Sequence, residues 1–294
     1  MIKKWGTTCG VWGDVIVGLG YFLDRIGEGK ILYLGNNDQI IKFLNCQPFI
    51  TEVRKIPVAE NRDWAKYWMY TVFNQTLKED PDFTSFPEKP FYEAGYSDSN
   101  LKITHLTKED CTIDAPLYLW SGVKLPKEIN DWAKEMASKL PKEFYLFQPY
   151  SFNSNSPQDH WQNWNGLANL ITKRTNKKLV IIGNDWLPRI DYYSQSILSS
   201  ETISLYNQVP SMMHVFGLAR YAKGIITTSN SLAHWCQIDN LPCLVINNRK
   251  STRPNYIFRR VLNWPGINFV EYEDDLNFAY NKVCESVFSL SKTI

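Results

Sequence analysis

Residues 224–248 read Gly224-Ile-Ile-Thr-Thr-Ser-Asn-Ser-Leu-Ala-His-Trp-Cys-Gln-Ile-Asp-Asn-Leu-Pro-Cys-Leu-Val-Ile-Asn-Asn248 and decide the fold of the chain. The apolar, β-branched start predicts a strand that is buried on both faces. The polar residues 228–231 then predict the start of a helix. A second apolar run, 243–246, predicts the next strand. Strand, helix and strand in this order are typical of a parallel sheet with helices on its faces.

Polar side chains gather at the turn between the first of these strands and the helix. Thr228, Ser229, Asn230 and Ser231 supply three hydroxyls and one amide. A helix that begins here directs backbone N–H groups and the positive end of its dipole beyond the strand, which suits a phosphate or another anion. Ligands of open α/β sheets bind in that crevice. An ordinary capped turn would contain the same residues, so both interpretations stand at this point.

The same alternation runs through the whole second half of the chain. Its sequence predicts further strands over 144–147, 178–182 and 202–205, and helices over 161–175, 188–198, 211–222 and 275–290. This order is typical of a doubly wound domain. An amphipathic helix is predicted over 129–140, and we place the domain boundary directly after it.

The first half shows a weaker alternation. We expect a strand at 2–5, a turn at 6–13, strands over 30–34 and 51–56, and helices over 14–26, 38–45 and 61–78. Residues 79–114 combine prolines, charges and aromatic side chains, which indicates an irregular insertion. The predicted fold is therefore α/β, with two Rossmann-like doubly wound domains facing a cleft, residues 1–140 and 141–294. Whether the last predicted helix, 275–290, packs back on the first domain stays open.

Composition limits the class of protein. The 294 residues are 44% hydrophobic and 21% charged, which describes a globular chain large enough for two domains. A net charge of +2 does not indicate a general nucleic-acid binder. The six cysteines have neither C-x-x-C nor zinc-ligand spacing. No apolar run approaches the ~20 residues of a membrane span. We expect a cytoplasmic protein with reduced thiols, and a peripheral position at a membrane surface stays open.

Four segments, in the same order, resemble the heptosyltransferase-like glycosyltransferases of family nine, which have the two-domain GT-B fold. They are Trp12-Gly-Asp-Val15, Gln148-Pro-Tyr-Ser151 with Asp159-His-Trp161, Ile181-Ile-Gly-Asn-Asp185, and Ser229-Asn-Ser-Leu-Ala-His234 with Leu241-Pro-Cys-Leu-Val245. The chain departs from the family at His160 and Gln162, where the family has Lys and Pro. It also departs at Ser229 and Ser231, where the family has Asp and Gly. These departures favour a divergent member with a different donor or acceptor.

The resemblance implies a reaction. Such an enzyme moves a sugar from a nucleotide-activated donor to a hydroxyl acceptor, here a saccharide or a glycolipid. Inversion at the anomeric carbon, no cofactor and no strict need for a metal ion are part of what the resemblance implies. Asp14 is the expected general base, which removes the proton from the acceptor hydroxyl. As an acid in the first turn of a helix, Asp14 would equally serve as a cap.

The donor is expected at the carboxyl ends of the strands in the second domain. Ser229, Asn230 and Ser231 are candidates for binding the diphosphate. His234 either reaches the same phosphates or packs against the sheet. The remaining candidates for donor binding are Ser151, Asn153, His160, Gly183 and Asp185. The acid at 185 would accept hydrogen bonds from ribose hydroxyls, or it is a solvated loop residue.

Two other functions stay open. Arg249 and Arg253 belong to a basic run that would bind an anionic acceptor or the phosphates, or would be a solvated surface. Together with the aromatic residues of 79–114, this run permits a hydroxylated base in DNA as the acceptor. The second alternative is a non-catalytic GT-B module that only binds a nucleotide or a carbohydrate.

Overall fold

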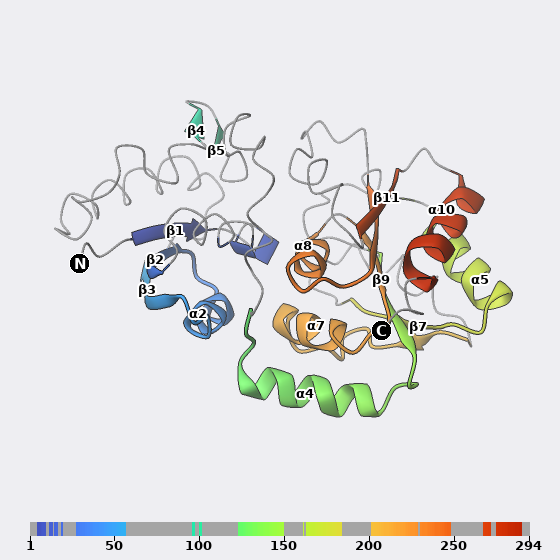
Figure 1. Ribbon diagram of the computed structural model, residues 1–294, viewed down its shortest axis with the longest axis horizontal. Coiled ribbons are helices and arrows are strands. Elements are labelled where there is room, and N and C mark those ends of the chain that lie inside the picture. The colour runs from blue at the N-terminus through green and yellow to red at the C-terminus, as the bar shows by residue number, and fades with distance from the viewer. Residues whose placement is uncertain are drawn as a thin grey trace. The chain divides into compact units, whose positions relative to one another are not determined.

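The computed structural model describes residues 5–9, 12–13, 15–16, 19, 28–56, 96–97, 100–101, 123–149, 161, 163–183, 201–228, 230–247, 267–271 and 275–289. The chain divides into two compact units, Met1–Pro126 and Lys127–Ile294, each with a parallel sheet (Figure 1). The two units are described one after the other.

The first unit contains three parallel strands in the spatial order β1, β2, β3. They are β1 (Trp5–Cys9), β2 (Gly29–Leu34) and β3 (Ile50–Ile56). β1 lies where we expected a turn, because Thr7, Thr8 and Cys9 continue the pairing with β2 that Trp5 begins. Threonine favours strands, and this preference outweighs the glycine at position 6.

Helix α2 (Asp38–Asn45) has the bounds that the sequence predicted. The Asn37 side chain caps its first turn, and Ile40, Phe43 and Leu44 are buried. The helix packs beside β3. A short antiparallel pair, β4 (Tyr96–Ser97) and β5 (Asn100–Leu101), lies within the expected insertion. The helices predicted over 61–78 and 188–198 lie outside the described residues.

The second unit is built on six parallel strands in the spatial order β11-β10-β9-β6-β7-β8. They are β6 (Phe144–Gln148), β7 (Lys178–Ile181), β8 (Ile203–Ser204), β9 (Ile225–Thr228), β10 (Cys243–Asn247) and β11 (Ile267–Glu271). Numbered along this unit, the order is 3-2-1-4-5-6, the doubly wound arrangement. It changes direction between β6 and β9, and this point is called the switch point below.

Helices cover both faces of this sheet. Helices α4, α7 and α8 lie on one side, and α5 and α10 lie on the other (Figure 1). Their bounds are α4 (Lys127–Ser138), α5 (Trp164–Arg174), α7 (Met212–Ala219), α8 (Ser231–Ile238) and α10 (Leu276–Val283), which continues into a π-helical turn, Cys284–Phe288. Helix α4 belongs to the second unit because it packs against α7.

Alternate strand residues fill the core between the sheet and the helices α5 and α10. Tyr145 and Phe147 of β6 are fully buried there, as the period of two along a strand requires. The last helix contributes Ala279, Val283 and Val287 to the same core, so its apolar stripe is buried in the second unit. A Cβ atom at Gly224 would overlap Val287, which explains the glycine before β9.

Candidate functional site

The carboxyl ends of β6 and β9 lie side by side at the switch point. Gln148, the last residue of β6, is in register with Thr227 of β9. Helix α8 begins only three residues after β9 ends at Thr228. Ligands of doubly wound sheets bind outside this point, so these residues form the candidate site.

Asn230 joins the three elements that meet here. Its Oδ1 accepts hydrogen bonds from the backbone N–H groups of Leu232 (2.9 Å) and Ala233 (3.2 Å) and so caps α8. Its Nδ2 donates to Gln148 Oε1 at 3.2 Å and to Thr227 Oγ1 at 3.0 Å. The Asn230 side chain therefore has the capping role that we considered, and the cap occupies two of the N–H groups that begin the helix.

Ser231 is the first helical residue and is partly exposed. The cap formed by Asn230 uses neither its hydroxyl nor its backbone N–H group. Both groups lie on the turn where the sequence predicts that the diphosphate binds. Binding of a donor by Asn230 and Ser231 stays a prediction.

His234 lies one turn further along α8, and only 7% of its surface is exposed. Burial lowers the pKa of His234 to about 4, although the nearby Gln237 side chain raises it. The imidazole is therefore neutral at pH 7, and any contact with a phosphate would be a hydrogen bond without a charge on the histidine. All the residues of α8 from 232 to 238 are buried.

Gly183 follows the end of β7. Its carbonyl accepts a hydrogen bond from the backbone N–H of Asn207 at 2.9 Å. A Cβ atom at this position would lie 3.2 Å from the Tyr206 ring, so the glycine allows the ring to lie close. The structure thus gives Gly183 a packing role, and its part in donor binding stays a prediction.

The other predicted site residues lie outside the described part of the chain. They are Asp14, Ser151, Asn153, His160, Asp185, Ser229, Arg249 and Arg253. On either side of position 14, Gly13 and Val15 are helical, and Val15 is fully buried. The roles of all eight residues remain predictions.

Aromatic side chains fill the core near the candidate site. The Phe147 and Trp164 rings meet edge to face at 5.4 Å, and Trp161 meets Trp164 in the same way at 5.3 Å. Trp161 belongs to the motif Asp159-His-Trp161, and it is buried. This part of the motif therefore supports the core next to the end of β6. Edge-to-face pairs contribute about 1 kcal/mol beyond their buried area.

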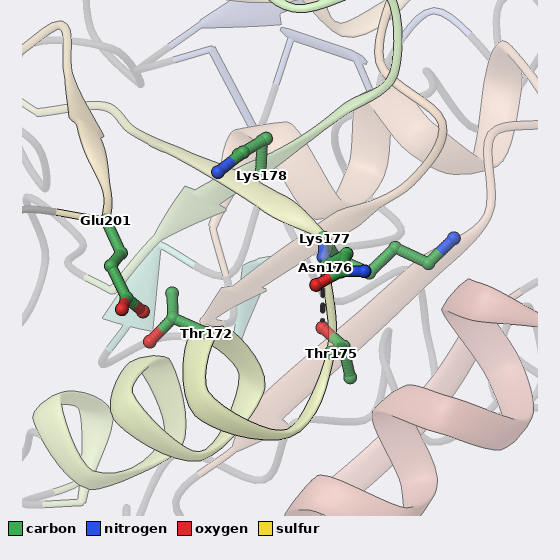
Figure 2. A pocket seen from close by; sticks show the side chains of 6 residues that line it. All are labelled: Thr172, Thr175, Asn176, Lys177, Lys178 and Glu201. Atoms are coloured by element: carbon green, nitrogen blue, oxygen red, sulfur yellow. Dashed lines mark hydrogen bonds between the residues drawn. The ribbon is translucent and has the colours of Figure 1, made fainter.

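The structure shows a hollow of about 170 Å³ elsewhere (Figure 2). It is lined by Thr172, Thr175, Asn176, Lys177, Lys178 and Glu201. These residues end α5, precede or begin β7, or precede β8, so the hollow lies at the amino ends of the strands, away from the switch point. The Lys177 and Lys178 side chains point apart in Figure 2. The Lys177 ammonium group instead lies 5.5 Å from the centre of the Tyr145 ring. The lysine side chains of the hollow are therefore not placed together to bind a diphosphate.

Within the described ranges, no three His, Cys, Asp or Glu side chains are placed to hold a metal ion. Asp80 and Asp82 have Asp-x-Asp spacing, which occurs in metal sites, and they lie outside those ranges. The described residues also include no helix long and apolar enough to cross a membrane.

No family model and no curated protein matches the sequence, whereas solved structures do match the fold. The structure of the Escherichia coli ADP-heptose lipopolysaccharide heptosyltransferase II has a TM-score of 0.59 at 12% identity, and the match covers 98% of both chains. The E. coli heptosyltransferase WaaC with ADP has a TM-score of 0.56 at 14% identity over 99% of both chains. The UDP-GlcNAc 2-epimerase of Methanocaldococcus jannaschii has a TM-score of 0.53 at 12% identity, over 97% of this chain and 92% of the other.

The match over the whole chain confirms the expected GT-B fold, with two Rossmann-like α/β units. It also confirms, for the fold, the resemblance to heptosyltransferases that four short motifs indicated. The epimerase has the same fold with a different chemistry, so the reaction has to be argued from the site.

Sequence reasoning missed Gln148 as a site residue. Gln148 begins the motif Gln148-Pro-Tyr-Ser151, and the sequence indicates no role for its side chain. The motif's place at the end of a strand was the available signal. The contact with Asn230 depends on β6 and β9 being neighbours, which only the sheet order shows.

Proposed function

We propose that this chain is an inverting glycosyltransferase that moves a sugar from a nucleotide-activated donor to a hydroxyl acceptor, a saccharide or a glycolipid. The observation that carries the proposal is the polar cluster of Gln148, Thr227 and Asn230 at the switch point of a doubly wound sheet. Fold similarity to two heptosyltransferases supports the same reaction class.

The donor diphosphate would bind at the start of α8. The hydroxyl and backbone N–H of Ser231 would donate hydrogen bonds to phosphate oxygens, helped by the positive end of the helix dipole. His234 would add a hydrogen bond as a neutral imidazole, which its low pKa supports. Asp14 would remove the proton from the acceptor hydroxyl as this oxygen attacks the anomeric carbon.

The test is the Asp14→Asn variant. Loss of a general base lowers the rate by about 10²–10⁴-fold, so we expect transfer to fall by that much while donor binding is retained. Transfer is measured as nucleoside diphosphate release, and binding by calorimetry with ADP and UDP. Asp38→Asn is the matched control, because Asp38 is an exposed acid in the first turn of α2 and the sequence predicts such a position for Asp14.

The products separate this proposal from its alternatives. A glycosyltransferase releases a nucleoside diphosphate only when an acceptor is present, and the new bond has the inverted anomeric configuration. An epimerase returns an altered nucleotide sugar without any acceptor. A module that only binds would hold the nucleotide and release no product, and full transfer activity in Asp14→Asn would exclude Asp14 as the base.

A further inference from the structure

The three side chains of the polar cluster at the switch point are neutral and are joined by hydrogen bonds. Gln148 Oε1 and Thr227 Oγ1 each accept a hydrogen bond from Asn230 Nδ2. The backbone N–H groups of Leu232 and Ala233 can only donate, so they fix which end of the Asn230 amide is oxygen. The NH₂ end is then directed at Gln148 Oε1 and Thr227 Oγ1.

The polar cluster connects the end of β6 with the first turn of α8. Gln148 belongs to β6, Thr227 to β9, and Asn230 caps α8. The position of the next residue, Ser231, is therefore set from two neighbouring strands. A ligand held by Ser231 would lose its geometry if the Asn230 amide were free to turn, since small displacements weaken hydrogen bonds and reduce preorganisation.

We propose that Gln148 is a positioning residue for the donor site, acting through the Asn230 amide on the first turn of α8. This inference rests on the proposed function. Gln148 holds the NH₂ end of the Asn230 amide, so it limits the movement of the cap and thereby raises the affinity for the nucleoside diphosphate part of the donor. Thr227 acts in the same way from β9. It is wholly buried, so it affects the ligand only through Asn230.

Gln148→Met and Thr227→Val test the inference. Methionine has nearly the length of glutamine but lacks its acceptor, and valine replaces the threonine hydroxyl with a methyl group. Loss of one hydrogen bond that orients the cap changes affinity by about tenfold. We expect calorimetry with ADP and UDP to show this loss in both variants. The KM for the donor should rise by the same factor, with kcat changed less than twofold.

A double-mutant cycle separates positioning from direct contact. In the Asn230→Ala background the amide is gone, so Gln148→Met should cause no further loss of affinity. Gln208→Met is the matched control, because Gln208 is exposed and its side chain donates to the Ser204 carbonyl at 3.0 Å. It should bind the nucleotides like the wild type.

Each result decides. If the wild type binds a nucleotide and Gln148→Met binds it equally well, the inference is wrong and the proposed function stands. A loss that persists in the Asn230→Ala background shows direct contact and also overturns it. If Gln148→Met does not fold, Thr227→Val decides by the same comparison. A wild type that binds neither nucleotide nor any nucleotide sugar overturns the proposed function together with the inference.

Discussion

His234 shows how burial changes what a histidine contributes. The sequence left two roles open for it, a phosphate ligand or a side chain packed against the sheet. The structure buries it on α8 and lowers its pKa to about 4, mainly by desolvation. A neutral histidine can donate one hydrogen bond and accept another, but it supplies no positive charge at pH 7.

The stability of the protein should depend on pH through this residue. The pKa of His234 is lower in the folded protein, about 4, than the ordinary value of 6.5 in the unfolded chain. The unfolded chain therefore binds a proton first as the pH falls. The contribution of neutral His234 to the free energy of unfolding is therefore fully present above pH 6.5. It is lost as the pH falls from 6.5 to 4, and the loss is about 3 kcal/mol in total.

Urea unfolding of the wild type and of His234→Gln at pH 7 and pH 5 measures this dependence. We expect the wild type to lose about 2 kcal/mol more than the variant over that interval. His214→Gln is the control: burial also lowers the pKa of His214, but this residue is partly exposed and Glu128 raises its pKa. An equal loss in wild type and His234→Gln would contradict the assignment.

Asn230 shows what a sequence can and cannot predict about a single residue. Asparagine is among the preferred N-cap residues, so its position after a strand already indicated a cap. The partners of its NH₂ group were not predictable. They lie on two strands, and one of these strands is far away in the sequence.

At the scale of helices and strands, local patterns predicted most elements. Helix α2 has the predicted bounds, and β6, β7, β9 and β10 lie where apolar runs indicated buried strands. Such runs are reliable because a central strand of a parallel sheet is buried on both faces. β11 was missed because Ile267-Asn-Phe-Val-Glu271 is an edge strand and mixes apolar with polar residues.

Two helix glycines differ in what surrounds them. A Cβ atom at Gly217 of α7 would lie 3.0 Å from the Cβ of Ala133 and 3.4 Å from the Ile129 carbonyl oxygen on α4. A Cβ atom at Gly166 of α5 would meet the end of the Leu276 side chain, at 2.9 Å. The Ala133 Cβ and the Ile129 carbonyl oxygen are fixed to the backbone of α4, whereas the end of the Leu276 side chain can rotate away.

We therefore expect different results from the same substitution at the two sites. Alanine gains about 1 kcal/mol of helix propensity over glycine at either site. Gly217→Ala should still lower the free energy of unfolding by about 1 kcal/mol, because separating α4 from α7 costs about 2 kcal/mol. Gly166→Ala should leave it unchanged or raise it. Urea unfolding measures both, and equal effects would contradict the close packing of α4 on α7.

At the scale of the molecule, the chain divides into two compact units. The sequence predicted two α/β domains and placed the boundary after residue 140. Helix α4, before that point, packs on α7 of the second unit. An amphipathic helix shows its apolar face in the sequence, but the partner that covers this face is set by tertiary packing.

A chain of two compact units should depart from two-state unfolding. We expect calorimetry to show two transitions. A saturating nucleoside diphosphate should raise the midpoint temperature of the transition that belongs to Lys127–Ile294. At a hundredfold excess over Kd, binding adds about 2.7 kcal/mol to the stability of the unit that binds. Hydrogen exchange with mass spectrometry assigns the transitions. A shift confined to Met1–Pro126 would place the nucleotide in the first unit.

The central position of β6 has a consequence for synthesis on the ribosome. β6 is the first strand of its sheet to be made, yet one of its two neighbours is β9, whose Ile225 pairs with Leu146. Until β9 emerges, one edge of β6 has backbone N–H and C=O groups without a strand partner, and its side chains are apolar. Such exposed edges promote aggregation. The nascent second unit should therefore be bound by chaperones and cut readily by proteases until residues beyond Thr228 have left the exit tunnel.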